Sequence, residues 1–135
     1  MTVEAQIAAA RGARQRRRRI NLAALSAAFV LFLVSDWLVA EGSPAKGLVG
    51  LGLAAIFAGV QMDPRSDPLQ RHTALLAFAL GAGVGILWLV VNTVWAMTSD
   101  GHQIAPGGTL QVFASAWMAA GLVLHLRLDR TTRQR

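Results

Sequence analysis

The arginines of this 135-residue chain are confined to alternate gaps between four long apolar stretches, and this pattern restricts the fold more than any other feature. Six arginines precede the first stretch, two lie between the second and third, and four follow the fourth: Arg11, Arg14, Arg16, Arg17, Arg18, Arg19, Arg65, Arg71, Arg127, Arg130, Arg133 and Arg135. The two remaining loops hold Lys46 and no other basic residue. Because cytoplasmic loops of membrane proteins carry an excess of Lys and Arg, the pattern predicts a multi-pass membrane protein with both termini in the cytoplasm.

The composition supports a membrane protein of a single domain. Hydrophobic residues make up 54% of the chain, charged residues 15%, and the mean hydropathy is +0.46. We expect an all-α fold, a four-transmembrane-helix bundle, because the backbone of a segment in lipid must satisfy its own hydrogen bonds. The predicted spans reach roughly 27 to 37 Å, enough for a hydrocarbon core of ~30 Å. A basic arm (1–19), four spans within 20–126 and a basic tail (127–135) make up the chain; the spans are 20–40, 44–62, 73–97 and 109–126.

A weak internal repeat suggests two tandem helical hairpins. At an offset of 56 residues, the segment LFLVSD that ends at Asp36 aligns with LWLVVN, which ends at Asn92. Gly and Pro follow both segments in the next loop. Each copy would begin and end on the same side of the membrane, so an axis along the membrane normal would relate them. Chance similarity within a narrow alphabet is the alternative explanation.

Asp36 and Asn92 are the candidate residues for an ion or proton site. Asp36 is the acidic residue within a predicted span, and an ionisable group in the membrane is a functional candidate. It lies only about 6 Å from the outer end of its helix, where hydration or a structural hydrogen bond is the simpler explanation. If the repeat is real, Asn92 would face Asp36 near the outer surface.

Small residues at four-residue intervals predict close helix packing. The third span contains Ala77, Gly81 and Gly85, and the second contains Ala55 and Gly59. Such spacing lets two backbones approach closely in lipid. It predicts packing faces, but the partner of each face, within the chain or outside it, is open.

The arginine run Arg16, Arg17, Arg18 and Arg19 fixes the topology of the chain and lies where it can attract anionic lipid headgroups. Each basic residue near an anionic membrane surface contributes about 1 kcal/mol of attraction. Nucleic acid is a less favoured partner, because the charges flank apolar segments instead of following one face.

Catalytic and cofactor chemistry finds little support. The chain has no Cys, and no nucleophile with a matched base, phosphate-binding Gly loop or pair of catalytic carboxylates is recognisable. Two histidines on facing helices can hold a haem, and His72 and His125 both lie near the cytoplasmic ends of spans. They also neighbour arginines at the lipid–water boundary, where polar residues are ordinary. We therefore expect neither enzymatic activity nor a cofactor.

These features favour an accessory or assembly subunit that packs against other membrane proteins or against copies of itself. The excess of Arg over Lys and the abundance of Ala suggest a bacterial chain, hence the inner membrane. The alternative function is a small ion-coupled carrier that uses Asp36 as its proton or cation site.

Overall fold

The computed structural model describes residues 2–39, 43–64, 67–101 and 108–133, and in these ranges it is all-helical, without strands. Its four helices are α1 (Val3–Leu38), α2 (Pro44–Gln61), α3 (Pro68–Thr98) and α4 (Gly108–Arg133). Each contains a segment long and apolar enough to cross a membrane. The all-helical fold class and four apolar helices predicted from the sequence are therefore confirmed. Ala40, Arg65 and Arg135, which belong to the predicted span and charge pattern, lie outside the described residues.

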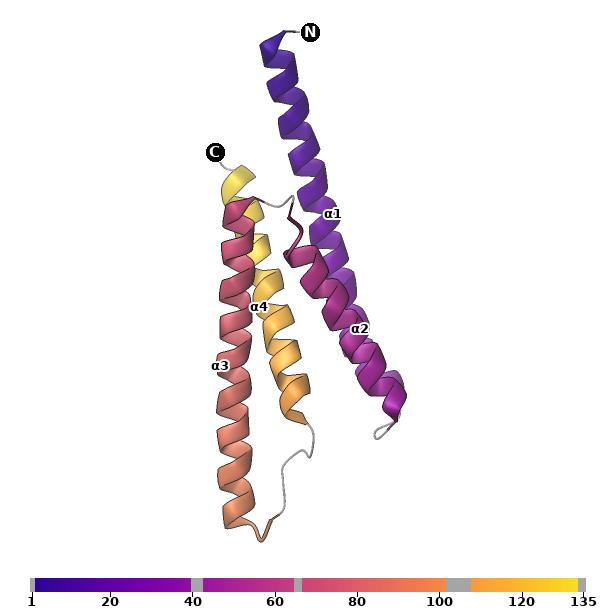
Figure 1. Ribbon diagram of the computed structural model, residues 1–135, viewed down its shortest axis with the longest axis vertical. Coiled ribbons are helices and arrows are strands. Elements are labelled where there is room, and N and C mark those ends of the chain that lie inside the picture. The colour runs from indigo at the N-terminus through magenta and orange to yellow at the C-terminus, as the bar shows by residue number, and fades with distance from the viewer. Residues whose placement is uncertain (1, 40–42, 65–66, 102–107, 134–135) are drawn as a thin grey trace.

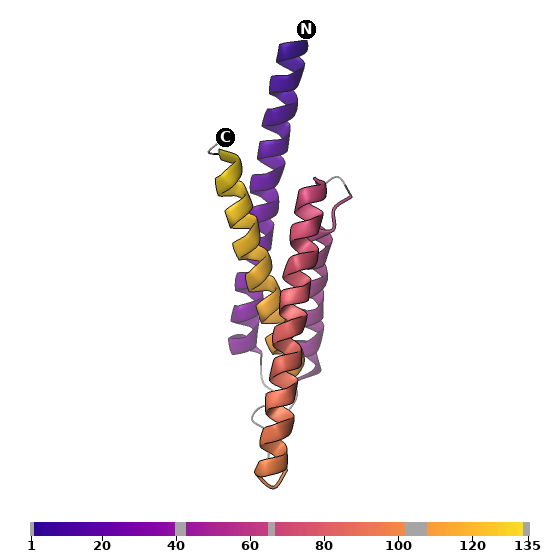
Figure 2. The same cartoon turned by 90° about the vertical axis from the view of Figure 1, so that its left-hand side faces the viewer.

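The helices form two antiparallel hairpins, α1 with α2 and α3 with α4 (Figure 1). Contact between α1 and α4 joins the hairpins, whereas α2 and α3 touch only slightly. The start of α1 and the end of α4 lie at the same end of the molecule (Figures 1 and 2), which we call the termini end. The last residues of α1 and α3 lie at the opposite end, which we call the loop end (Figure 1).

The core lies where the hairpins meet, and aromatic side chains of three helices dominate it. Trp117 of α4 packs edge-on against Phe57 of α2, with ring centroids 5.3 Å apart, and against Phe78 of α3 at 5.8 Å. Leu25 of α1 and Met118 of α4 are fully buried in the same cluster. Edge-to-face geometry brings the positive ring edge against the negative ring face. Trp117 thus packs between helices.

The helix boundaries depart from the predicted spans mainly at the termini end. The basic arm is not a separate helix, because α1 runs without interruption for 36 residues, roughly 54 Å. At the start of α2, Ser43 is the N-cap and accepts a hydrogen bond from the backbone N–H of Ala45 at 3.3 Å. Pro44 occupies the first turn, where its missing N–H leaves no hydrogen bond unmade.

Candidate functional site

Asp36 lies near the loop end of α1 and forms an ion pair with the neighbouring helix. The Nζ of Lys46 on α2 is 2.7 Å from Oδ1 of Asp36 and 3.4 Å from its backbone oxygen. The side chain of Gln111 on α4 also faces this carboxylate. The attraction between the carboxylate of Asp36 and the ammonium group of Lys46 holds α1 and α2 together at this level.

Asn92, the other residue of the predicted ion site, is buried on α3. The structure brings Asp36 together with Lys46 of α2 and Gln111 of α4, and Asn92 is not among these contacts. The core at the level between the two ends is filled by apolar side chains, including Phe32, Phe57 and Met118. The polar groups at the loop end are therefore separated from the termini end by packed hydrocarbon.

The small-residue face of α3 packs tightly against α4. A Cβ added to Gly81 would lie 2.5 Å from Cβ and 2.7 Å from Cα of Trp117. At Gly85 an added Cβ would lie 3.0 Å from Cβ of Phe113, and Ala77 is fully buried on the same face. Glycine is required at Gly81 because the obstacle there includes backbone atoms, which cannot rotate away. This face is occupied within the chain.

The small-residue face of α2 has no such neighbour. Ala55 and Gly59 are exposed, and a Cβ at Gly52 or Gly59 would meet nothing within 4 Å. The opposite side of α2 is the one that packs within the bundle, where Phe57 is buried and Gly50 lies against Phe32. The helix therefore has one face inside the protein and an exposed row of small residues outside it.

A group of buried polar side chains surrounds Gly121 of α4 in the half nearer the termini end. Nδ1 of His125 lies 2.8 Å from the backbone oxygen of Gly121 and must donate, since a carbonyl only accepts. The amide nitrogen of Gln61, a residue 2% exposed, lies against Gly121 from α2. Within the described ranges, this nitrogen and Nε2 of His125 are buried and unpaired. His72 is exposed on α3, so the two predicted histidines do not share this interior.

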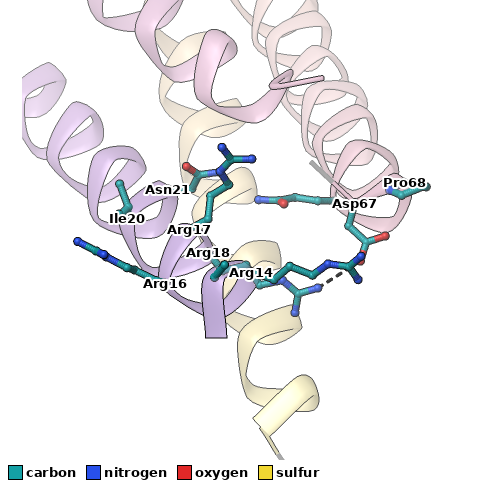
Figure 3. Close-up of a pocket in the computed structure, with 10 residues that line it drawn as sticks. Arg14, Arg16, Arg17, Arg18, Ile20, Asn21, Asp67 and Pro68 are labelled. Atoms are coloured by element: carbon teal, nitrogen blue, oxygen red, sulfur yellow. Dashed lines mark hydrogen bonds and ion pairs between the residues drawn. The ribbon is translucent and has the colours of Figure 1, made fainter. Parts of the chain in front are cut away.

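The arginine run borders a cavity between α1 and the start of α3. Figure 3 shows Arg14, Arg17 and Arg18 on the side of α1 nearest Asp67, while Arg16 points away from that residue. A nitrogen of Arg18 is 3.3 Å from an oxygen of Asp67, which links the two hairpins. Arg19 does not line the cavity. Of the four arginines at 16–19, which the sequence pattern assigned to topology, the first three border the cavity and Arg19 does not.

Gln61, Gln70 and Gly121 are structurally prominent residues that the sequence did not single out. Each lies near a helix end or within an apolar run, and burial of the glutamines becomes apparent only once the helices are packed. The four-residue interval from Trp117 to Gly121 to His125 was the available signal that these residues share one face of α4. No family model, curated protein or solved structure matches this chain.

Proposed function

We propose that the protein is a small inner-membrane subunit without enzymatic activity, which stabilises or assembles a complex by packing α2 against a transmembrane helix of another subunit. The observation that carries this proposal is the contrast between the two small-residue faces. The face of α3 around Gly81 is filled by α4, whereas the face of α2 around Gly59 has no neighbour.

Lipid alone is a poor partner for the exposed face of α2. Glycine and alanine offer few atoms for dispersion contacts with acyl chains, but they let a second helix backbone approach closely. The exposed positions Gly52, Ala55 and Gly59 follow one another at intervals of three and four residues, so they form one continuous strip along α2. A helix seated on this strip would gain backbone contacts that larger residues would prevent.

The test is a comparison of two leucine substitutions on α2 in the full-length protein. We expect Gly59→Leu to release the protein from a larger complex, because the new side chain fills the strip. Gly47→Leu is the matched control, since Gly47 is also open within 4 Å but lies off the strip. Native gels after extraction in mild detergent report the size of the complex, and two differently tagged copies distinguish a foreign partner from self-association.

Two results would overturn this function. One is a wild-type protein that runs as an isolated monomer and yields no crosslinked partner in native membranes. The other is a Gly59→Leu variant that keeps the same complex as the Gly47→Leu control.

The carrier function is less favoured by the geometry. A transport site needs access from both sides in turn, whereas the carboxylate of Asp36 has Lys46 against it and apolar core between it and the termini end. The accessory role requires no such pathway. Asp36→Asn is the variant that discriminates between the two, and its expected behaviour is argued in the Discussion.

A further inference from the structure

The cavity beside the arginine run is half open and large enough to admit a ligand group. It has a volume of about 820 Å³ and is lined by ten residues from α1 and the start of α3: Ala13, Arg14, Arg16, Arg17, Arg18, Ile20, Asn21, Asp67, Pro68 and Gln70. Arg14, Arg17 and Arg18 of α1 lie on the side of the cavity nearest Asp67, whereas Arg16 borders it but points away (Figure 3). The cavity is separate from the strip on α2 to which the proposed function is assigned.

The charge of this lining selects an anion. Four arginines contribute to it, and Asp67 is its one acidic residue. That carboxylate is held by Arg18, so the positive charge of Arg14, Arg16 and Arg17 is not neutralised by the lining itself. Guanidinium groups present planar sets of N–H donors that match the oxygens of a phosphate.

A neutral donor in the same cavity points to a ligand with several oxygen atoms. Gln70 is 6% exposed and is one of the residues that line the cavity. Its side-chain amide carries N–H donors, and a ligand oxygen in the cavity would accept a hydrogen bond from it. Asn21 adds a second amide to the lining, one turn beyond Arg17 on α1.

The position of the cavity along the molecule indicates which anion it meets. Its lining includes Ile20, the first residue of the apolar part of α1, and Pro68, the first residue of α3. These positions are where the charged segment of α1 gives way to the apolar one, which is the level of the lipid headgroups. Basic pockets between helices at this level suit the headgroups of anionic lipids.

We propose that this cavity binds the phosphate headgroup of one anionic phospholipid of the membrane. Arg14 and Arg17 bind the phosphate oxygens, and the amides of Asn21 and Gln70 donate further hydrogen bonds to the headgroup. Arg18 and Asp67 hold α1 and α3 together across the site. This is a defined site with a stoichiometry of one lipid per chain, and it differs from the general attraction of a basic arm for a negative surface.

Native mass spectrometry of the full-length protein in detergent, titrated with phosphatidylglycerol, tests the site. We expect Arg17→Gln to weaken binding about tenfold, because it removes a charge-assisted hydrogen bond. The control is Arg19→Gln. It removes the same charge two residues along the helix from Arg17, at a position that does not line the cavity. It should weaken binding less than about threefold, through long-range attraction alone.

Neutral substitutions separate a built site from surface attraction. Gln70→Met and Asn21→Leu leave the net charge unchanged, and each should weaken binding several-fold because it removes a donor to the headgroup. Two variants are used so that a folding defect in one, detected by circular dichroism and gel filtration, leaves the other informative. Equal losses in Arg17→Gln and Arg19→Gln, with no loss in either neutral variant, would overturn the proposal.

Three further ligands, phosphatidylcholine, inorganic phosphate and a short RNA, identify the source of the anion. Phosphatidylcholine, which has a phosphate but no net charge, should bind at least tenfold more weakly than phosphatidylglycerol. Inorganic phosphate at millimolar concentration should leave the lipid bound. If phosphate displaces the lipid, or if a short RNA binds the same residues more tightly, the site is not a lipid site and the assignment is wrong.

Discussion

At the scale of single residues, Gly81 makes the strictest steric demand. Alanine at this position would bring its Cβ to 2.5 Å from Cβ of Trp117 and 2.7 Å from the Trp117 backbone, so α3 and α4 would have to separate. We expect Gly81→Ala to lower the free energy of unfolding by about 1–3 kcal/mol, a typical effect of overpacking. Tryptophan fluorescence during titration of the detergent-solubilised protein with sodium dodecyl sulfate measures this change.

Gly83 provides the control for that measurement. It lies two residues along α3, and an added Cβ there would meet nothing within 4 Å. Gly83→Ala should therefore leave the stability unchanged or raise it by up to about 1 kcal/mol, because alanine favours the helix. Similar losses of stability in both variants would show that α3 and α4 do not pack in the way described.

The sequence predicted a packing face at each of two sets of small residues, but it did not predict what each face meets. Ala77–Gly81–Gly85 and Ala55–Gly59 have the same four-residue interval, yet the first is covered by α4 and the second is exposed. The interval is a property of one helix, whereas its partner depends on how all four helices are arranged. The contact of Asp36 with Lys46 was missed for the same reason, since it depends on the turn between two helices.

At the scale of helices, the ion pair of Asp36 and Lys46 fastens α1 to α2 near the loop end. The side chains are 35% and 23% exposed, respectively, so the pair is partly solvated. A double-mutant cycle of Asp36→Asn and Lys46→Met should give a coupling free energy of about 0.5–1 kcal/mol. The same denaturant titration measures it, and a coupling of zero would contradict a direct contact.

The single variant Asp36→Asn also distinguishes the two candidate functions. For an accessory subunit we expect proton-driven efflux in cells that produce the variant to equal that in cells with the wild-type protein. A carrier that depends on this carboxylate would lose its transport. Lys46→Met is the control, because it breaks the same ion pair while keeping the acidic group.

The weak sequence repeat predicted that the two hairpins are related by a twofold axis, and their contacts do not follow that symmetry. A twofold axis relating α1–α2 to α3–α4 would make the α1–α4 and α2–α3 contacts equivalent. Instead, α1 and α4 pack closely while α2 and α3 barely touch. The lengths of the paired helices differ too, 36 and 18 residues against 31 and 26. The small residues of α4, such as Ala114 and Gly121, let neighbouring helices approach it from several sides. The alignment of the chain with itself at an offset of 56 residues does not reveal which helices these are.

At the scale of the whole molecule, the described arginines and the single lysine lie at opposite ends. The arginine-rich start of α1 and the end of α4 lie at the termini end, whereas Lys46, near the start of α2, lies near the loop end (Figure 1). The alternation of apolar and basic segments was sufficient to predict four helices. The length and apolar character that a span needs, and the internal hydrogen bonding of its backbone, are properties of that segment alone. Which end faces the cytoplasm rests on the positive-inside rule and is therefore the prediction to test.

The absence of native cysteine makes that test direct. Single cysteines at Ala9 and Thr131 mark the termini end, and single cysteines at Ala45 and Asp100 mark the loop end; all four positions are exposed. A membrane-impermeant maleimide added to intact spheroplasts should label Ala45→Cys and Asp100→Cys at once. It should label Ala9→Cys and Thr131→Cys only after the membrane is permeabilised, because the arginine-rich end is retained in the cytoplasm. If the two termini positions report opposite compartments, the number of membrane crossings is odd. One of the four helices then does not span, and both the strip on α2 and the headgroup cavity would have to be placed anew.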